Sequence, residues 1–316
     1  MQILLCGRTF PHARAMLKSR LPADELLVCE HSPAALRDAV ADVDVVLPFM
    51  SHIDAALMDA GRFRLIHQFG AGLEGVDVAA ARARGIWVAN APSSDTGNAE
   101  SVAEHALLLI LAVLRQLPVA QANVRAEILG TPLGRALQGC TVCLLGLGAI
   151  ATALAARLRP FGVRLVGITR RPDEARTAAL GLAACHPFSD REAAFATTDI
   201  LVVCLPLTPE TRGIVDARTF EALPKGACVV NVGRGLLVDE TALRAALVGG
   251  HLSGAGLDVF QREPVPPDDP LLALPNVIAT PHIAGVTDRS YSGTADVVAA
   301  NVERLRRGEP PIHRVA

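Results

Sequence analysis

The sequence has no large excess of charge of either sign. Its 30 lysines and arginines nearly balance 32 aspartates and glutamates, which leaves a net charge of −2 at neutral pH. Proteins that bind nucleic acid or anionic membranes by electrostatic attraction usually carry a clear positive surplus. We therefore expect a small dissolved molecule as the partner, and neither nucleic acid nor a membrane.

The sequence also lacks a long apolar run. The longest fully apolar stretch, Ala106–Leu114, is far shorter than the roughly 20 residues of a membrane-spanning helix. Residues 1–10 do not resemble a signal peptide, because the apolar segment Ile3–Cys6 is short and no small-residue cleavage site follows it. These features predict a cytoplasmic protein, and its 316 residues are enough for two domains.

Cysteine does not follow a disulfide or zinc pattern. There are seven cysteines, an odd number, and most lie among apolar residues, as expected for small core side chains in a reducing compartment. Cys140 and Cys143 form a C-x-x-C motif, but no second pair or histidine cluster accompanies it. Core packing is the favoured interpretation, a redox or zinc site is the alternative, and we expect no metal.

Short apolar runs alternate with alanine-rich helical stretches along the first part of the chain. This alternation predicts parallel strands joined by right-handed crossover helices, which is an open α/β sheet. A longer helical pattern from Asn98 to Leu117 could connect two domains. The expected strands of the first domain are Ile3–Cys6, Leu26–Cys29, Val43–Leu47, Leu65–Phe69 and Ile86–Ala89.

A second alternating series begins at Thr141, and a last helical pattern runs from Asp288 to Arg307. If the last helix returns to the first domain, that domain is discontinuous. We expect two doubly wound parallel-sheet α/β domains, of Rossmann and flavodoxin-like type, joined by long helices. Residues 1–97 with 288–316 would form the substrate domain, and residues 98–287 the dinucleotide-binding Rossmann domain. The expected strands of the second domain are Val142–Leu145, Val163–Thr169, Ile200–Cys204, Cys228–Val232, Gly254–Val259 and Val277–Ala279.

A glycine-rich turn follows the first strand of the second series. Gly146 permits a tight turn, Gly148 lets the backbone approach a pyrophosphate, and Ala151 takes a position where helix and strand pack closely. The N–H groups of Ala149 and Ile150, at the positive end of the next helix, would hold the phosphates. A glycine turn without a ligand is the alternative, but the flanking strand and helix favour a dinucleotide.

Two arginines stand where an NAD site usually has an acidic residue. The second strand ends at Thr169, Arg170 and Arg171 follow it, and the next acid, Asp173, lies beyond a proline. Guanidinium groups suit the 2'-phosphate of NADP through forked, charge-assisted hydrogen bonds. The pattern therefore favours NADP(H), and solvated arginines with NAD(H) bound less selectively are the alternative.

Three side chains with complementary chemistry follow strands of the second series. Arg234 lies between two glycines just after a strand, Glu263 lies in a proline-rich segment, and His282 comes soon after the last strand. The carboxyl ends of parallel strands meet at the edge of the sheet where ligands bind. Each residue alone could be an ordinary loop residue, and only together do they indicate a catalytic group.

A series of short motifs extends over most of the chain, from Phe69 to Gly285. They are Gly70–Asp77, Val102–His105, Gly146–Ala151, Leu205–Gly213, Val232–Gly235, Leu257–Phe260, Glu263–Pro264 and Pro281–Gly285. In order and spacing these motifs resemble the D-isomer-specific 2-hydroxyacid dehydrogenase family.

The resemblance implies an NAD(P)-dependent oxidoreductase, a D-2-hydroxyacid dehydrogenase that interconverts a 2-keto acid and a D-2-hydroxy acid. Arg234 would clamp the substrate carboxylate and carbonyl oxygen. His282 would exchange a proton with that oxygen, and Glu263 would favour the imidazolium and orient the ring.

The resemblance also assigns residues to the cofactor and the substrate. Backbone N–H groups at Ala71 and Gly72 would bind the substrate carboxylate, and Asp258 would contact the nicotinamide carboxamide. The residues expected to line the cofactor are Leu205, Pro206, Thr211 and Val232.

The segment Thr169–Pro172 resembles the NADPH-using glyoxylate and hydroxypyruvate reductases, so a small 2-keto acid is the first substrate expectation. A short-form phosphoglycerate dehydrogenase is an alternative, since the chain ends at Ala316 without the extra regulatory domains of many such enzymes. A dinucleotide-sensing, corepressor-like protein without turnover is the alternative from another class, but the full Arg-Glu-His set argues against it. The resemblance suggests a homodimer formed through the cofactor-binding domain.

Overall fold

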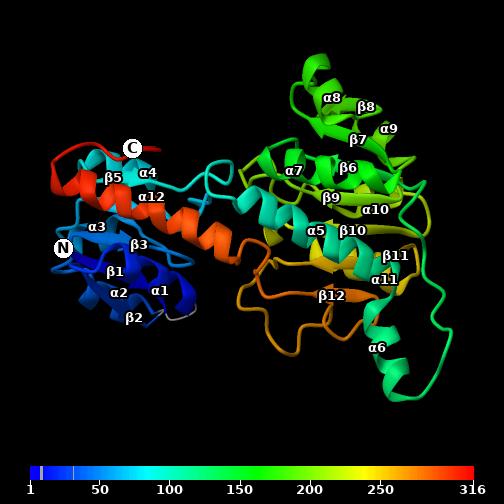
Figure 1. The fold of residues 1–316 in the computed structure, drawn as a ribbon, viewed down its shortest axis with the longest axis horizontal. Coiled ribbons are helices and arrows are strands. Elements are labelled where there is room, and N and C mark those ends of the chain that lie inside the picture. Colours follow the sequence, from blue (N-terminus) through cyan, green and yellow to red (C-terminus); the bar gives the residue numbers. More distant parts are fainter. Residues whose placement is uncertain (8–9, 31) are drawn as a thin grey trace. The chain divides into compact units, whose positions relative to one another are not determined.

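Two compact units make up the computed structural model (Figure 1). The structure describes residues 1–7, 10–30 and 32–316. We call Met1–Asn98 with Thr287–Ala316 the N-terminal unit and Ala99–Val286 the central unit. Each unit has a parallel sheet with helices packed on it, which confirms the predicted α/β fold class. The roles expected of the two domains stay predictions.

The sheet of the N-terminal unit has the strand order β2-β1-β3-β4-β5, all parallel. Strand order reverses beside β1, as in flavodoxin-like doubly wound sheets. All the strands predicted for this part of the chain are confirmed, with ends that differ by no more than two residues. Their bounds are β1 Gln2–Cys6, β2 Glu25–Cys29, β3 Val45–Leu47, β4 Leu65–His67 and β5 Trp87–Ala89.

All the helices of the N-terminal unit except α1 begin at polar residues that cap them. Ser32, Asp54, Asp77 and Thr287 each accept a hydrogen bond from a backbone N–H of the first turn. The last helix, α12, buries a stripe at helical spacing and packs on α1. The helices are α1 Pro11–Arg20, α2 Pro33–Ala39, α3 Ala55–Ala60, α4 Val78–Ala83 and α12 Asp288–Arg306.

The central unit has a parallel sheet in the order β12-β11-β10-β9-β6-β7-β8. Counted from β6, this is the Rossmann order with one added strand. The predicted strands are confirmed, but β8 was missed, because it is a half-buried edge strand that ends in a proline and shows no alternation. The strands are β6 Thr141–Leu145, β7 Arg164–Thr169, β8 Ala184–Pro187, β9 Ile200–Val203, β10 Ala227–Asn231, β11 Leu252–Leu257 and β12 Val277–Ala279.

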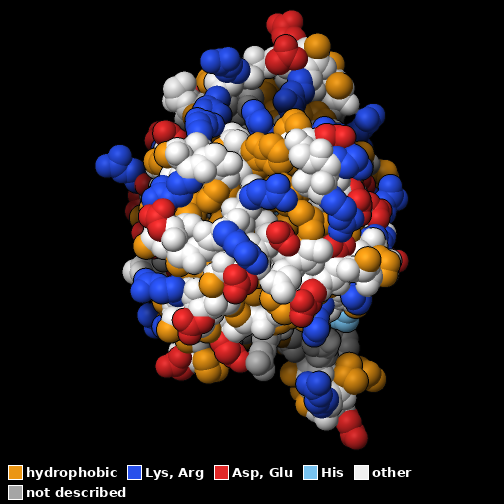
Figure 2. Space-filling model, turned by 90° about the vertical axis from the view of Figure 1, so that its left-hand side faces the viewer, with side chains coloured by type: hydrophobic (Ala, Val, Ile, Leu, Met, Phe, Trp, Pro, Cys, Tyr) orange, Lys and Arg blue, Asp and Glu red, His pale blue; other side chains and the backbone are white. Residues whose placement is uncertain are grey.

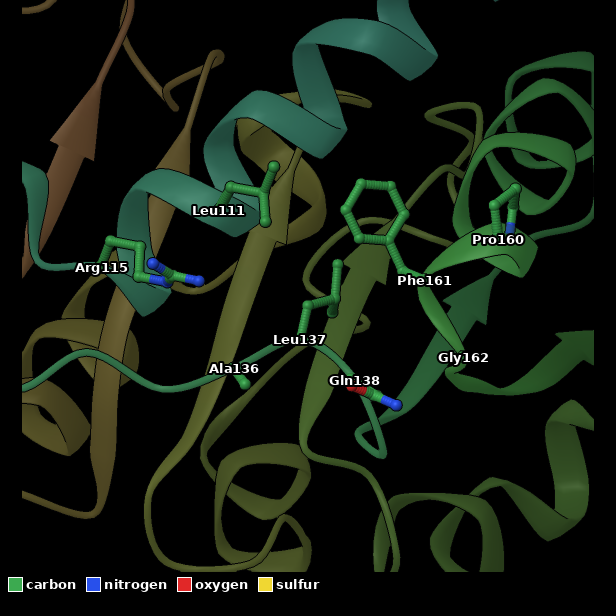
Figure 3. A pocket seen from close by; sticks show the side chains of 8 residues that line it. All are labelled: Leu111, Arg115, Ala136, Leu137, Gln138, Pro160, Phe161 and Gly162. Atoms are coloured by element: carbon green, nitrogen blue, oxygen red, sulfur yellow. The ribbon is translucent and has the colours of Figure 1, made fainter.

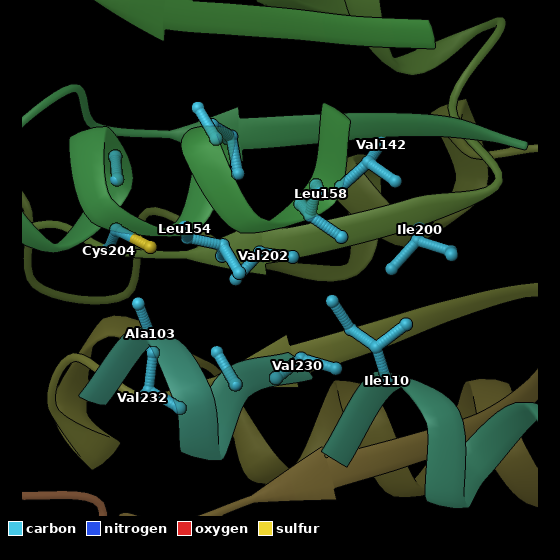
Figure 4. Packing of buried hydrophobic residues seen from close by; sticks show 14 of the residues in the cluster. Ala103, Ile110, Val142, Leu154, Leu158, Ile200, Val202, Cys204, Val230 and Val232 are labelled. Atoms are coloured by element: carbon cyan, nitrogen blue, oxygen red, sulfur yellow. The ribbon is translucent and has the colours of Figure 1, made fainter. Parts of the chain in front are cut away.

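Apolar side chains cover both faces of the central sheet. On one face, α5 and α7 bring Ala103, Ile110, Leu154 and Leu158 against strand residues such as Val202 (Figure 4). Phe195, Phe220 and Leu243 from α9, α10 and α11 cover the other face. The helical elements are α5 Asn98–Leu114, α6 Leu117–Arg125, α7 Ala149–Leu158, η1 Arg159–Phe161, α8 Glu174–Leu180, η2 Phe188–Asp190, α9 Arg191–Phe195, α10 Ala217–Ala222, η3 Gly235–Leu237 and α11 Glu240–Val248.

The long helix predicted for 98–117 ends earlier than expected. α5 stops at Leu114, because Gln116 adopts a left-handed backbone with φ 48°, and α6 then begins with a proline in its first turn. Within the described part of the chain, no single helix is long and apolar enough to cross a membrane. The bent pair α5 and α6 meets that test of length and composition only when the two are taken together, across a 59° bend.

Charged side chains of both signs are interspersed on the face that Figure 2 shows. Surface ion pairs of the N-terminal unit include Arg84–Asp59 at 2.6 Å and Arg20–Asp296 at 2.7 Å. This mixture follows from the near balance of acidic and basic residues in the sequence.

Candidate active site

Arg234 lies in a tight turn at the carboxyl end of β10. The Oδ1 atom of buried Asn231 accepts a hydrogen bond from the Gly233 N–H at 3.0 Å, and its Nδ2 donates to the Arg234 carbonyl at 2.9 Å. Gly235 lets the chain pass close to the next segment, since a Cβ there would lie 1.8 Å from the carbonyl carbon of Phe260. The turn therefore places the Arg234 side chain at the carboxyl edge of the sheet.

Glu263 and His282 form a close pair. The Nδ1 atom of His282 lies 2.7 Å from Oε2 of Glu263, and Oε1 of Glu263 accepts the Phe260 N–H at 2.9 Å. The side chain of His282 is 34% exposed and that of Glu263 is 18% exposed, so a small molecule can reach both. Because Nδ1 is hydrogen-bonded to Glu263, Nε2 is the ring nitrogen that can exchange a proton with a ligand.

The contacts of Glu263 decide its charge. Burial raises the pKa of this carboxyl group, but the hydrogen bond and charge of His282, the Phe260 N–H and the Arg234 charge together lower it below its usual value. Glu263 is therefore a carboxylate at neutral pH, and Arg234 lies within electrostatic reach of it.

Asp258 holds the segment that carries His282. This aspartate is 1% exposed, and its carboxylate accepts hydrogen bonds from the Ile283 N–H at 2.9 Å, the Ala284 N–H at 2.9 Å and the Thr280 hydroxyl at 2.6 Å. Its carbonyl accepts the His282 N–H at 2.8 Å. These bonds hold His282 in a left-handed conformation with φ 54°, which is uncommon for a residue with a Cβ.

The hydrogen bonds by which Asp258 fixes the segment of His282 were not predicted from the sequence, and neither was the contact of His105 with this network. The Nε2 atom of His105, on α5, lies 2.9 Å from the Thr280 hydroxyl, which in turn donates to Asp258. Nothing in the sequence around His105 indicated this partner, because the two residues are far apart in the chain. A contact of Asp258 with the nicotinamide carboxamide stays a prediction.

The three predicted catalytic residues lie at the carboxyl edge of neighbouring strands. Arg234 follows β10, Glu263 belongs to the segment after β11, and His282 follows β12, and these strands are adjacent in the sheet. The central unit thus brings a guanidinium, a carboxylate and an imidazole together from distant parts of the chain. Their catalytic roles stay predictions.

The glycine turn between β6 and α7 has an open approach. Gly146 has φ 95°, and a Cβ there would meet Leu205 at 2.8 Å, so only glycine fits without strain. Gly148 caps α7, and a Cβ built on it meets no atom of the described chain within 4 Å. Ala149 and Ile150 form the first turn of the helix, and Ala151 is fully buried. The residues present therefore suit a phosphate group at the start of α7.

The segment after β7 bears on the choice of dinucleotide. Thr169 ends the strand, and Arg170 and Arg171 are exposed beyond it. Asp173 caps α8 by accepting the Arg176 N–H at 2.7 Å, so this carboxylate already has a structural use. The Arg176 guanidinium donates to the Leu147 carbonyl in the glycine turn, a contact that sequence reasoning missed.

The remaining residues expected to line the cofactor lie near this turn or after neighbouring strands. Leu205 packs against Gly146, and Val232 is buried just after β10. The hydroxyl of Thr211 donates to the Pro206 carbonyl at 2.8 Å and so closes the loop that joins them. Their contacts with a cofactor stay predictions.

Ala71 and Gly72, expected to bind the substrate carboxylate, belong to the N-terminal unit. They lie in the loop after β4, where the Asn90 amide donates to the Ala71 carbonyl at 2.8 Å. Ala71 is exposed and Gly72 half-buried. Substrate binding by this loop stays a prediction.

A hollow of about 440 Å³ opens at the other edge of the central sheet (Figure 3). Its residues come from the end of α5, the segment before β6 and the turn before β7, so it lies at the amino ends of the strands. Ligands of open α/β sheets bind outside the carboxyl ends, so the chemistry of the side chains and not this hollow locates the candidate site. The lining residues are Leu111, Arg115, Ala136, Leu137, Gln138, Pro160, Phe161 and Gly162.

No group of three or more His, Cys, Asp and Glu side chains in the described ranges could hold a metal ion.

Comparison with known proteins gives matches over most of the chain. Residues 107–284 match the family described as D-isomer specific 2-hydroxyacid dehydrogenase, NAD binding domain. Glyoxylate reductase from Korarchaeum cryptofilum is 34% identical over 290 residues, which cover 89% of this chain and 85% of that protein.

D-3-phosphoglycerate dehydrogenase from Mycobacterium bovis is 38% identical over 275 residues, which cover 86% of this chain. The match covers 51% of that enzyme, so the chain spans about half the length of these curated relatives. Among solved structures, the NADPH-dependent glyoxylate/hydroxypyruvate reductase of Sinorhizobium meliloti, in complex with NADP and malonate, superimposes with a TM-score of 0.81. It is 36% identical and covers 100% of this chain and 96% of its own.

Proposed function

We propose that this chain, which belongs to the D-isomer specific 2-hydroxyacid dehydrogenase family, reduces a small 2-keto acid of the glyoxylate and hydroxypyruvate class with NADPH. The observation that carries the proposal is the 2.7 Å contact between His282 and Glu263, within electrostatic reach of Arg234. Reduction of a carbonyl beside a carboxylate needs a proton donor and a cation, and this edge of the sheet offers both.

The three side chains have different tasks in this reaction. The nicotinamide cofactor, when bound, supplies the hydride. Arg234 binds the substrate carboxylate and stabilises the negative charge that develops on the carbonyl oxygen. His282 gives its Nε2 proton to that oxygen, and Glu263 stabilises the imidazolium beforehand and keeps the ring in one orientation. In the oxidative direction, the neutral ring takes the proton back.

The glycine turn and the arginines support a bound NADP(H). The open approach at Gly148 and the backbone N–H groups of Ala149 and Ile150 suit a pyrophosphate. Arg170 and Arg171 are exposed at the end of β7, where the adenosine ribose of a dinucleotide binds in Rossmann domains. Their guanidinium groups would pair with a 2'-phosphate, and the nearby Asp173 is engaged in capping α8.

A second candidate is oxidation of 3-phosphoglycerate with NAD. The 38% identity to phosphoglycerate dehydrogenases favours it, although the chain spans about half of their length. The same three side chains would serve that reaction, so the distinction lies in the substrate and not in the chemistry.

One panel of assays tests both candidates. The full chain is incubated with glyoxylate, hydroxypyruvate, pyruvate or 3-phosphohydroxypyruvate, each with NADPH and with NADH, and coenzyme oxidation is followed by absorbance. We expect turnover with glyoxylate or hydroxypyruvate and a preference for NADPH. Faster turnover of the phosphorylated acid with NADH favours the second candidate. Dinucleotide binding without turnover of any acid contradicts both and supports a sensing protein.

We also infer that the chain forms a homodimer through the central unit. None of the residues of α6 is buried, and apolar side chains on it and after it are exposed: Val124 at 78%, Leu129 at 94% and Leu133 at 93%. Covering such side chains with a second copy removes apolar surface from water.

A cytoplasmic location stays a prediction.

Light scattering tests the dimer. The double variant Leu129→Asp with Leu133→Asp should halve the particle mass, because it places charges in the covered surface. The control Val248→Asp changes a residue that is 66% exposed elsewhere in the central unit and should leave the mass unchanged. A native particle with the mass of one chain contradicts the inference.

A further inference from the structure

Cys6 and Cys29 lie side by side at the carboxyl ends of two adjacent strands. They are register partners in the parallel pair β1 and β2. Both side chains belong to the same buried cluster, so they point to the same face of the sheet, and the two thiols are hydrogen-bonded to each other. Neighbouring strands are about 4.8 Å apart, which is within the Cα separation of about 4.4–6.8 Å found in disulfides.

The two thiols differ in a way that suits an attacking and a resolving cysteine. The hydrogen bond from the Cys6 thiol lowers the pKa of Cys29 against the opposing effect of burial, and the backbone N–H of Gly7 lowers it further. The same hydrogen bond, with burial, raises the pKa of Cys6. Cys29 is 8% exposed and Cys6 1%. A small oxidant therefore meets Cys29 first, as the better nucleophile.

The C-x-x-C motif of the central unit provides an internal contrast. Cys140 belongs to the core cluster on one face of the sheet and Cys143 to the cluster on the other face. Burial raises the pKa of both thiols, that of Cys143 to about 12. These two sulfurs point to opposite faces, so the sequence motif that suggests redox chemistry cannot close a disulfide without rearranging the strand.

We propose that Cys6 and Cys29 form a redox site, in which hydrogen peroxide or another small hydroperoxide converts the two thiols into a reversible disulfide. The Cys29 thiolate attacks the peroxide, an S–O bond forms as the O–O bond breaks, and hydroxide leaves to become water. The Cys6 sulfur then attacks the resulting sulfenic acid, so that an S–S bond forms as the S–O bond breaks and a second water leaves. The two sulfurs lose the two electrons that the peroxide gains.

Peptide mapping of the full chain tests the proposal. Pre-reduced protein is treated with hydrogen peroxide near neutral pH, denatured in acid, alkylated with iodoacetamide and analysed by mass spectrometry. We expect the number of free thiols to fall from seven to five, with a cross-linked peptide pair that contains residues 6 and 29. Dithiothreitol should restore all the thiols.

Variants then separate the two roles. Cys6→Ser should stop at a sulfenic acid on Cys29, which dimedone traps, and Cys29→Ser should lose the reaction. The control Cys140→Ser keeps a donor for the Ala136 carbonyl, which the Cys140 thiol contacts at 3.3 Å, and should still form the cross-link.

Other products overturn the proposal. A thiol count that stays at seven, a cross-link between other cysteines, or direct over-oxidation of Cys29 to a sulfinic acid in the native chain would each contradict it. The native chain alone supplies these readouts, so the test does not depend on the folding of any variant.

Discussion

Two histidines at the ends of parallel strands, one in each unit, show how surroundings give one residue type opposite uses. His67 ends β4 in the N-terminal unit and is fully buried, whereas His282 follows β12 in the central unit with 34% of its side chain exposed. His67 meets amide groups and His282 meets a carboxylate. Burial keeps the first neutral in the core, and the second lies beside a carboxylate at the edge of the sheet.

The partners of His67 determine its protonation. The Oδ1 atom of Asn301 accepts the Ile312 N–H at 2.7 Å, so its Nδ2 must point to Nε2 of His67, at 2.9 Å, and donate to it. The Nδ1–H of His67 then donates to the Gln68 carbonyl at 3.0 Å. Burial lowers the pKa of His67 to about 4. His282 has a different partner, because its Nδ1 atom lies 2.7 Å from a carboxylate oxygen of Glu263.

The largest expected effect tests the catalytic side of this comparison. His282→Ala should lower kcat about 10²–10⁴-fold, the usual contribution of a general acid or base, and leave the Kd for NADPH nearly unchanged. Steady-state kinetics and a fluorescence titration measure the two quantities. An unchanged kcat would remove His282 from the mechanism and end the contrast with His67.

The second effect concerns stability and pH. Because the pKa of His67 is about 4 in the folded chain and about 6.5 when unfolded, the unfolded state binds the proton more readily between these values. The contribution of neutral His67 to the free energy of unfolding is therefore complete above pH 6.5. It falls by about 3 kcal/mol as the pH drops to 4. Urea unfolding at pH 7.5, 6.0 and 4.5 measures this loss.

A substitution isolates His67 from other titrating groups. His67→Leu should destabilise the chain at pH 7.5 by about 1–3 kcal/mol, because the Asn301 amide loses its acceptor, and should flatten the slope with pH. The control His12→Gln changes an exposed histidine of the same unit and should keep the native slope. An equal slope in the native chain and the leucine variant contradicts the neutral, buried state.

A smaller effect is expected from the carboxylate that distinguishes His282. Glu263→Gln keeps the shape of the side chain but removes its charge, so the imidazolium loses its stabilising partner. We expect keto-acid reduction to fall about tenfold, equal to about 1.4 kcal/mol. Steady-state kinetics measures this change, and a kcat equal to that of the native chain would show that the charge has no role.

The smallest effect is expected for the arginines after β7. Arg170→Ala with Arg171→Ala should raise the KM for NADPH about 2–5-fold, as expected from the loss of solvent-exposed ion pairs worth up to about 1 kcal/mol, and barely change that for NADH. Arg218→Ala, an exposed arginine of the same unit, is the control. Equal losses for both coenzymes would contradict recognition of the 2'-phosphate.

Much of the fold could be predicted because its signals are local. Apolar runs separated by helical patterns located all the strands except β8, and Asp288–Arg306 has the apolar spacing of a helix packed on one side. The break between α5 and α6 was missed, because the left-handed conformation of Gln116 has no sequence signal comparable to a glycine. β8 was missed because an edge strand does not need an alternating pattern.

The candidate site was predictable in part. Arg234, Glu263 and His282 were recognised from motifs, and the structure places them after neighbouring strands. Two sets of hydrogen bonds were not predictable, because they join residues far apart in the chain: the Asp258 carboxylate accepts from the segment of His282, and His105 lies within hydrogen-bond distance of Thr280. The cysteines show the same limit. The C-x-x-C motif indicated Cys140 and Cys143 as a possible redox pair, whereas the cysteines that are partners in a sheet are Cys6 and Cys29.

By itself the sequence determined the element types, the doubly wound class, the glycine turn and the set of chemical groups available. These depend on spacing along the chain, and periodicity and turn-forming residues report spacing directly. Only the tertiary structure decided which histidine faces a carboxylate and which an amide, which carboxylate holds a turn, and which cysteines are partners in a sheet. Those depend on the alignment of strands that are distant in sequence, and protonation, pairing and reactivity respond to neighbours within a few ångströms.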